Sequence, residues 1–347
     1  MTPFYIPLTN VAGAVTSGKA TLDLPLTWRY KTVLLKFATT GTPANLPAVV
    51  STITLKINNR PQRIREAYQI NQINLKNSSG FAPQLGIAAV NDAIATPGSL
   101  SAWTVSSAGV INGYVGVDGI FKNLAGKTTA LPSGSFVYLP YCFAEIFRKN
   151  YTAGDAMSLP TFNAAGKPIF GSVQLEVQLG ASAAAANALS ASAEVDLVPL
   201  EMSRPGNPTV PMLSKWATYV GTSVASSEIT INNLPRSTDQ AFQALYFWTD
   251  SFLGAITTPV ASCKVKANNT LILDGASKVE SDLRDIRCEL SYAALSANRY
   301  DISFDADDRV NSALNLGTIS EFTVSPTFGA GTAGIFHLGY DSYGPLW

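Results

Sequence analysis

The sequence contains one histidine, so any mechanism that uses an imidazole as a base depends on that residue. His337 lies in the run Gly-Ile-Phe-His-Leu-Gly-Tyr. A Ser-His-Asp or Cys-His mechanism needs a nucleophile beside this base, but the sequence offers neither a Gly-x-Ser-x-Gly turn nor a suitably placed cysteine. We therefore interpret His337 as a structural residue of a strand. We expect no catalytic residue and no enzymatic activity.

The second candidate for chemistry is the one acidic cluster of the sequence. It contains Asp301, Asp305, Asp307 and Asp308, but Arg309 stands where a calcium-binding loop has an oxygen ligand, and no glycine follows. A solvated turn would explain the cluster. The alternative is a loosely held structural Ca²⁺ on Asp305, Asp307 and Asp308, and a glycosidase carboxylate pair is a further alternative that nothing else supports. Because phosphate-binding loops and dinucleotide fingerprints are missing, we expect no other cofactor.

The three cysteines do not form a recognisable pattern. Cys142, Cys263 and Cys288 are odd in number and widely spaced, without a Cys-x-x-Cys pair. This spacing supports neither a disulfide framework nor a zinc site. We interpret the cysteines as small buried hydrophobic residues of a protein in a reducing compartment.

The basic residues give no electrostatic footprint for nucleic acid. Lysine and arginine together number 24, as do aspartate and glutamate, so the net charge is zero. One small group, Lys56 with Arg60, Arg63 and Arg65, stands near the expected start of a helix. We interpret it as pairing with acidic neighbours at a subunit contact, and we expect no direct nucleic-acid binding.

The charge content is unusually low for a soluble protein. Charged residues make up 14% of the chain, against about 25% in an ordinary domain. A surface with so few charges favours association, so we expect the chain to bury its outside against copies of itself. The alternative is an extracellular β-rich domain with an uncharged polar surface. We see neither a secretory signal nor an apolar stretch long enough for a membrane-spanning helix.

The sequence contains an internal repeat of short sequence words. Lys56-Ile57-Asn58-Asn59 and Lys266-Ala267-Asn268-Asn269 stand 210 residues apart, as do Leu24-Pro25 and Leu234-Pro235. The apolar runs 33–37 and 244–248 lie between them at an offset of 211. After each Asn-Asn pair, apolar residues at helical spacing (64 to 75, and 279 to 290) predict a strand, a turn and an amphipathic helix. A chance match of short words is the alternative, but the shared order favours tandem duplication.

The rest of the chain fits two β-rich units. We expect an extended N-terminal arm over 1–19, a first sandwich over 20–200 and a second, with a C-terminal tail, over 214–347. Prolines at 199, 205, 208 and 211 mark a Pro-rich linker over 201–213. Strands such as 173–179, where Val, Leu, Val and Leu alternate with polar residues, recur at the spacing of a sandwich.

The first unit contains a segment without counterpart in the second. Residues 80–134 are rich in glycine and hold four charged residues, Asp92, Asp118, Lys122 and Lys127. We interpret them as an insertion with short strands of its own, such as 110–117. Because loops tolerate growth at the end of a sandwich, we expect a surface tower that bears Trp103 and Tyr114.

Two tandem β-sandwiches, each with a helix after its third or fourth strand, resemble the double jelly-roll major capsid proteins of tailless icosahedral viruses, particularly lipid-containing bacteriophages. The resemblance covers 20–340 and rests on the unit from Leu24-Pro25 to Leu75 and its repeat from Leu234-Pro235 to Ile286. It implies an all-β fold of two tandem eight-stranded jelly-roll sandwiches with short inserted helices.

The resemblance also implies a function and partners. In that family three chains form a pseudo-hexagonal capsomer, so the expected partners are further copies of the chain, neighbouring capsomers, and vertex and membrane-associated virion proteins. The expected location is the virion capsid after synthesis in the host cytoplasm. We expect the termini to reach neighbouring capsomers or an underlying membrane. The alternatives are a jelly-roll glycan-binding module, for which Trp103 and Trp248 are candidate aromatics, and a carbohydrate-active enzyme.

Overall fold

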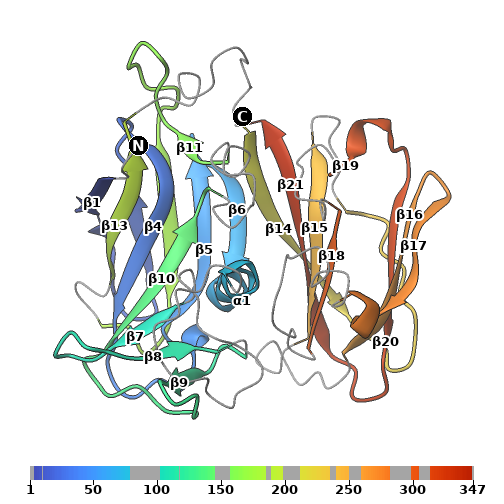
Figure 1. Ribbon diagram of the computed structural model, residues 1–347, viewed down its shortest axis with the longest axis horizontal. Helices are drawn as coiled ribbons and strands as arrows, with labels where there is room; N and C mark the ends of the chain where they lie inside the picture. The colour runs from blue at the N-terminus through green and yellow to red at the C-terminus, as the bar shows by residue number, and fades with distance from the viewer. Residues whose placement is uncertain are drawn as a thin grey trace. The chain divides into compact units, whose positions relative to one another are not determined.

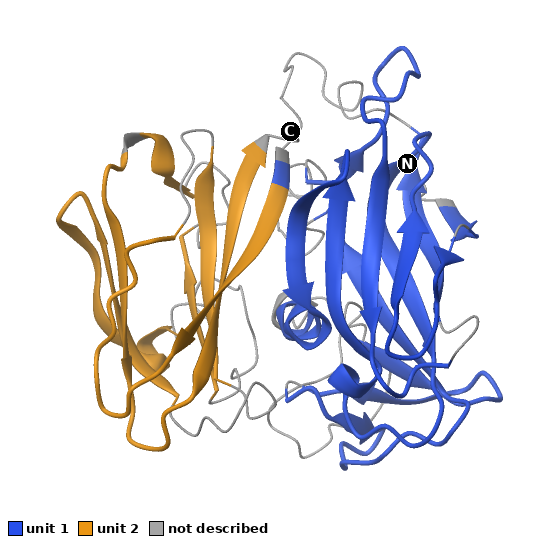
Figure 2. Cartoon of the chain, turned by 180° about the vertical axis from the view of Figure 1, so that it is seen from behind, with its two compact units in different colours: residues 1–213, 346–347 blue, residues 214–345 orange. Residues whose placement is uncertain are grey.

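The computed structural model divides the chain into two compact units (Figure 2). Unit 1 comprises Met1–Leu213 with Leu346–Trp347, and unit 2 comprises Ser214–Pro345. The residues that the structure describes are 4–9, 11–78, 102–116, 118–144, 157–184, 189–197, 212–234, 240–249, 259–281, 298–304 and 313–345. Most of the expected linker at 201–213 lies outside these ranges.

Unit 1 contains two antiparallel sheets (Figure 1). The first, which we call sheet A, has the order β1 (Phe4–Leu8), β13 (Leu189–Asp196), β4 (Arg29–Ala38), β10 (Phe136–Cys142), β7 (Trp103–Val105), β8 (Ile111–Val115) and β9 (Phe121–Asn123), and β11 (Leu159–Pro160) also pairs with β4. The second, sheet B, has the order β6 (Arg60–Glu66), β5 (Val50–Ile57), β12 (Val173–Leu179), β3 (Lys19–Asp23) and β2 (Val11–Ala12). The helices among the described residues of this unit are α1 (Ala67–Ser78) and the 3₁₀ helix η1 (Leu46–Ala48).

Unit 2 repeats this plan with fewer strands. Sheet C has the order β18 (Arg299–Ser303), β15 (Ala241–Trp248), β21 (Ile335–Pro345) and β14 (Met212–Thr222), with β19 (Leu314–Asn315) also paired to β15. Sheet D has the order β17 (Thr270–Ser277), β16 (Val260–Ala267) and β20 (Phe322–Phe328). The 3₁₀ helix η5 (Leu316–Thr318) precedes β20.

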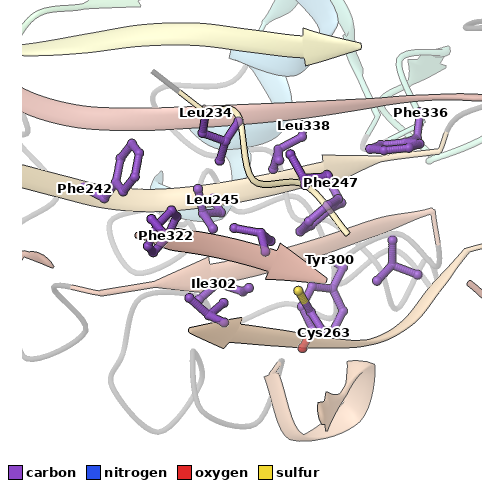
Figure 3. Packing of buried hydrophobic residues seen from close by; sticks show 14 of the residues in the cluster. Leu234, Phe242, Leu245, Phe247, Cys263, Tyr300, Ile302, Phe322, Phe336 and Leu338 are labelled. Atoms are coloured by element: carbon purple, nitrogen blue, oxygen red, sulfur yellow. The ribbon is translucent and has the colours of Figure 1, made fainter. Parts of the chain in front are cut away.

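The core of unit 2 lies between its two sheets. Phe242, Leu245 and Phe247 of β15 pack with Cys263 and Phe322 of sheet D (Figure 3). Every second side chain of a strand points to the same face, so one alternating set of apolar residues is enough to build this layer. The same rule builds unit 1, where the Val-Gln-Leu-Glu-Val-Gln-Leu sequence of β12 alternates between buried and half-buried positions.

The strand order of unit 1 is that of a jelly roll. Strands that follow one another along the chain change sheets, because β3 and β12 lie in sheet B whereas β4 and β13 lie in sheet A. β3 pairs with β12 and β4 pairs with β13, so a long antiparallel ribbon crosses from one sheet to the other. This wrapping is one way in which antiparallel sheets close into a sandwich. The expected all-β fold of two tandem jelly rolls is confirmed.

The strand registers show the internal repeat directly. On the first core strand, Leu35 and Leu245 are equivalent at an offset of 210; Leu35 pairs with Leu139 and Ala191, and Leu245 with Ile302 and Tyr340. By the same registers, Leu139 of β10 corresponds to Ile302 of β18 at an offset of 163, and Ala191 of β13 corresponds to Tyr340 of β21 at an offset of 149. Because the offset falls from 210 to 163, unit 1 carries 47 additional residues between β4 and β10. The sequence suggested an offset of 211 for the first core strand, which aligns the half-buried Leu34 with the core residue Leu245, whereas an offset of 210 aligns the buried Leu35 with it.

The two Asn-Asn pairs form equivalent turns. Asn58 and Asn59 have φ values of 50° and 62°, and Asn268 and Asn269 have 49° and 62°. Positive φ at both central positions defines the type I′ turn of a two-residue hairpin, and asparagine tolerates this conformation. The first asparagine of each pair also binds a neighbouring loop. Asn58 Oδ1 accepts hydrogen bonds from the backbone N–H groups of Gly171 and Ser172, at 2.7 and 3.3 Å.

Asn268 repeats these bonds in unit 2. Its Oδ1 accepts from the backbone N–H groups of Ser320 and Glu321, at 2.7 and 3.2 Å. Ser320 and Glu321 stand 149 residues after Gly171 and Ser172, which is the offset of the last strands. Each turn therefore binds the loop that precedes a later strand of its own unit, which is β12 in unit 1 and β20 in unit 2.

The helix that was predicted to begin soon after each turn begins later. A type I′ turn returns the chain antiparallel to the strand before it, and β6 and β17 occupy that place. α1 follows at Ala67 and ends at Ser78, near the predicted stop at 77–80. In unit 2 helical residues begin at Lys278, and the positions predicted from 283 to 290 lie outside the described residues.

The insertion of unit 1 extends sheet A. β7 pairs with β10, β8 with β7 and β9 with β8, so a short strand within 110–117 is confirmed. Asn71 of α1 holds the segment, since its Oδ1 accepts from Ala102 N at 2.7 Å and its Nδ2 donates to Val115 O at 3.3 Å. Tyr114 is buried rather than displayed, so the predicted tower is wrong in that respect. Residues 79–101 lie outside the described part.

The described parts of both termini are paired strands, whereas the sequence predicted an arm and a tail that flank the sandwiches. β1 pairs with β13 along Phe4 to Leu8, and β2 pairs with β3. At the other end, β21 continues to Pro345, and Tyr343 is buried opposite Ala241. Strand edges carry unpaired N–H and C=O groups, and pairing satisfies them, so these segments join the sheets of their own units.

A buried ion pair joins β4 to β13 in unit 1. Arg29 Nη2 lies 2.6 Å from Asp196 Oδ2, and Lys31 Nζ lies 3.9 Å from the same oxygen. All three side chains are less than a tenth exposed. Arg29 Nη1 also donates to Ser158 Oγ at 3.3 Å. One carboxylate therefore faces two buried cations.

We expect the two asparagines of one turn to respond differently to glycine. Asn59→Gly keeps a residue suited to positive φ, so the free energy of unfolding should stay equal or rise slightly. Asn58→Gly keeps that freedom but removes two hydrogen bonds, at about 1 kcal/mol each. Urea unfolding monitored by circular dichroism measures both. Equal stability of the two variants would contradict the role of the Asn58 side chain.

We expect the removal of Asp196 to cost more stability than the removal of Arg29. Asp196→Ala removes the carboxylate that two buried cations share, and breaking a buried ion pair typically costs about 3–5 kcal/mol. Arg29→Met should cost less, because Lys31 still faces the carboxylate. The comparison uses the free energies of unfolding of the two variants in urea. A smaller loss for Asp196→Ala than for Arg29→Met would overturn this assignment.

Candidate assembly surfaces

The residues that could carry acid–base or nucleophilic chemistry are part of the sheets. His337 lies on β21 opposite Trp248 of β15, and burial lowers its pKa. Burial raises the pKa of the Cys142 thiol to about 12, and it raises that of Cys263 as well. At neutral pH both thiols are therefore protonated, whereas a cysteine nucleophile acts as the thiolate. Cys288 lies outside the described residues.

The four residues of the acidic cluster divide into two sets. Asp305, Asp307 and Asp308 lie outside the described residues, so a calcium ion there stays a prediction. Asp301 is not a member of a solvated turn, because it lies buried in β18. Arg299 binds it through two bonds, Nε to Oδ1 at 2.8 Å and Nη2 to Oδ2 at 2.6 Å. The described part of the chain contains no group of three or more His, Cys, Asp or Glu side chains that could hold a metal ion.

The basic group of β6 does not form a surface patch. Arg63 and Arg65 are buried. Arg63 Nη1 donates to the Cys142 carbonyl at 2.8 Å, and its guanidinium carbon lies 5.3 Å from the centre of the Phe143 ring. The prediction that Arg63 serves a subunit contact is therefore wrong. The alternation of β6 places Arg63 on the side of the strand that meets β10, which the sequence alone did not indicate.

The outward face of sheet B is polar. Its centre is Glu176 of β12, which forms an ion pair with Lys19 at 3.2 Å and another with Lys56. The hydrogen bond from Lys56 is the main cause that lowers the pKa of Glu176. Gln174 donates to Asp23 Oδ1 at 2.6 Å on the same face. These polar side chains are compatible with water, and ion pairs at a protein surface generally contribute little to stability.

The outward face of sheet A has a different composition. Leu34 and Lys36 of β4 lie beside Phe136 and Tyr138 of β10, and all four side chains are half-buried. Lys36 Nζ lies 4.0 Å from the centre of the Phe136 ring and 5.6 Å from that of Tyr138. Tyr5, on the edge strand β1, is 73% exposed. We call the set Tyr5, Leu34, Lys36, Phe136 and Tyr138 the aromatic face.

Unit 2 carries a second apolar surface along β17. Leu271 and Ile272 are each 42% exposed, and Val279, just after the strand, is 65% exposed. Within the described residues β17 pairs on one side only, with β16. We call Leu271, Ile272 and Val279 the β17 edge. An exposed apolar edge strand is a common place for another chain to bind.

The two tryptophans considered for glycan binding are unequal. Trp248 is fully buried on β15, but beside Tyr246 and outside the core cluster of unit 2, whereas Trp103 is half-buried on β7. Neither the aromatic face nor the β17 edge was predicted from the sequence. Alternation along 29–38 and 136–142 could have indicated which residues point away from the core. No helix in the described part of the chain is both long and apolar enough to span a membrane.

Comparisons with known proteins agree at the level of structure. No family model matches the sequence, and no curated protein does either. The solved structure of the major capsid protein P2 from bacteriophage PM2 is similar with a TM-score of 0.63 at 12% identity, over 99% of this chain and 97% of that one. The STIV major capsid protein gives 0.61 at 12% identity over 100% and 98%, and the Faustovirus major capsid protein 0.57 at 8% over 100% and 90%.

These proteins are double jelly-roll capsid proteins of viruses, and each is matched over nearly its whole length. The similarity does not depend on one barrel alone, since it includes both units and their order along the chain. The resemblance noted from the sequence is confirmed for the fold. The chain has the double jelly-roll fold of these viral major capsid proteins.

Proposed function

We propose that this protein is a structural major capsid protein, three copies of which form a pseudo-hexagonal capsomer of an icosahedral virion shell. The observation that carries the proposal is the match of both jelly rolls, in one chain, to viral major capsid proteins over 90% or more of each chain's length. A tandem pair of jelly rolls gives each chain two similar blocks. Three chains then supply six blocks, which is the number that a hexagonal outline needs.

The surface chemistry supports a structural role. The aromatic face and the β17 edge offer apolar area for association, and the chain has few charges to oppose it. The proposed partners are other copies of the chain, together with vertex and membrane-associated proteins of the virion. The balanced charge gives no basis for direct contact with nucleic acid. The proposed location is the virion shell, after synthesis in the host cytoplasm.

Mass and shape test the proposal together. A trimer has a mass of about 110 kDa, three times 36.7 kDa, and light scattering on purified protein measures it. Electron microscopy of the same sample should show particles with a hexagonal outline. A monomer by light scattering would contradict the trimer, and a monomer that binds glycans on an array would favour the glycan-binding alternative.

We expect the trimer to be insensitive to salt. Obligate interfaces commonly bury more than about 2,000 Å² and are more apolar than ordinary surface, and the low charge content of this chain leaves few ion pairs to screen. The mass measured by light scattering should therefore stay constant when NaCl is raised to the order of 0.5 M, where exposed pairs are largely screened. Dissociation into monomers over that range would show that exposed charges hold the trimer together.

A further inference from the structure

The internal repeat allows the aromatic face of unit 1 to be compared with the same face of unit 2. In the strand registers, Lys36 corresponds to Tyr246 at the offset of 210, and Phe136 corresponds to Arg299 at the offset of 163. In unit 1 a cation from β4 lies over a ring from β10. In unit 2 the cation and the ring exchange strands: the guanidinium carbon of Arg299 on β18 lies 5.4 Å from the ring centre of Tyr246 on β15. Both units therefore place a cation on an aromatic ring, on the side that faces away from the core.

The two faces differ in their burial. Tyr246 is 7% exposed, and Arg299 and Trp248 are no more than 2% exposed. The corresponding side chains of unit 1, Lys36 and Phe136, are only half-buried. Two copies of one architecture thus carry the same kind of face, but only one of them is covered within the chain. The composition of the uncovered face suits a contact with protein better than a contact with water.

The β17 edge is the surface of unit 2 that could cover this face. Leu271 and Ile272 present apolar side chains from a strand whose other side is unpaired among the described residues. Asp274, three residues after Leu271, is exposed on the same strand, and it is a minor cause, after Glu228, that raises the pKa of Lys264 on β16. The aromatic face carries a positive charge on Lys36 at its centre and has Glu194 opposite Tyr5 at its margin. Lys36 and Asp274 therefore offer one pair of opposite charges between the two surfaces, in addition to their apolar area. Complementary charges of this kind fix the register of a contact.

We propose that in the assembled trimer the aromatic face of unit 1 binds the β17 edge of unit 2 of a second copy of this chain. The proposal rests on the trimer of the proposed function. A ring of three identical chains needs a heterologous interface, in which two different patches of each chain meet, since an isologous contact pairs only two chains. The aromatic face and the β17 edge are two such patches, one on each unit. Lys36 and Asp274 carry the opposite charges of the contact.

Three matched lysine variants test the contact. Leu34→Lys places a charge in the aromatic face, and Leu271→Lys places one in the β17 edge. Thr54→Lys is the control, because it adds the same charge to the polar outward face of sheet B, opposite Glu176. We expect light scattering to give the monomer mass of about 37 kDa for the first two variants and the trimer mass for the control. Far-ultraviolet circular dichroism confirms that each chain is folded.

Charge reversal tests the same contact without depending on how well those variants fold. Lys36→Glu and Asp274→Lys should each lower the fraction of trimer at a given concentration, and the double variant should restore it to at least half of the wild-type value. Trimers that survive in either leucine variant, or a double variant no better than the single ones, would overturn the assignment while leaving the trimer itself intact. A wild-type chain that is monomeric would instead remove the proposed trimer and this contact with it.

Discussion

A β-sandwich can bury only one face of each of its sheets, and this constraint governs the rest of the molecule. The inner faces are built from one alternating set of apolar residues per strand, such as Leu35 and Phe37 of β4. The outward faces receive no such cover from the sandwich itself. Their side chains must therefore suit water or another surface, and their composition shows which of the two each face meets.

The outward faces of the two sheets of unit 1 differ in composition. Sheet B carries the Lys19, Glu176 and Lys56 ion pairs, which remain partly exposed to water. Sheet A carries Leu34, Phe136 and Tyr138 around a single lysine that lies on the rings. Both sheets have the same strand geometry, so the fold does not require the difference. An apolar, aromatic outward face in a protein with so few charges is more economically explained by assembly than by folding.

The sequence predicted the parts of the fold that depend on local rules. The Asn-Asn pairs were found as a repeat because asparagine is one of few residues that accept positive φ, and both turns use it in the same way. The strand at 173–179 was predicted because its alternation is strict. The predicted start of the helix was too early because Arg60–Glu66 form strand β6, in which Arg63 and Arg65 are buried although they are charged. Their burial depends on the Cys142 carbonyl and the Phe143 ring, which are distant in sequence.

The outward faces were harder to predict because the chemistry of a face can be kept while its residues exchange places. In unit 1 the cation comes from β4 and the ring from β10, whereas in unit 2 the ring comes from β15 and the cation from β18. A residue-by-residue alignment of the two units pairs Lys36 with Tyr246 and scores this position as a mismatch. The physical contact between neighbouring strands is nevertheless the same, because a cation–ring pair is stabilised from either side. The same reasoning explains how chains about 12% identical share a fold over nearly their whole length, since what a sheet requires is the character of each face and not the identity of each residue.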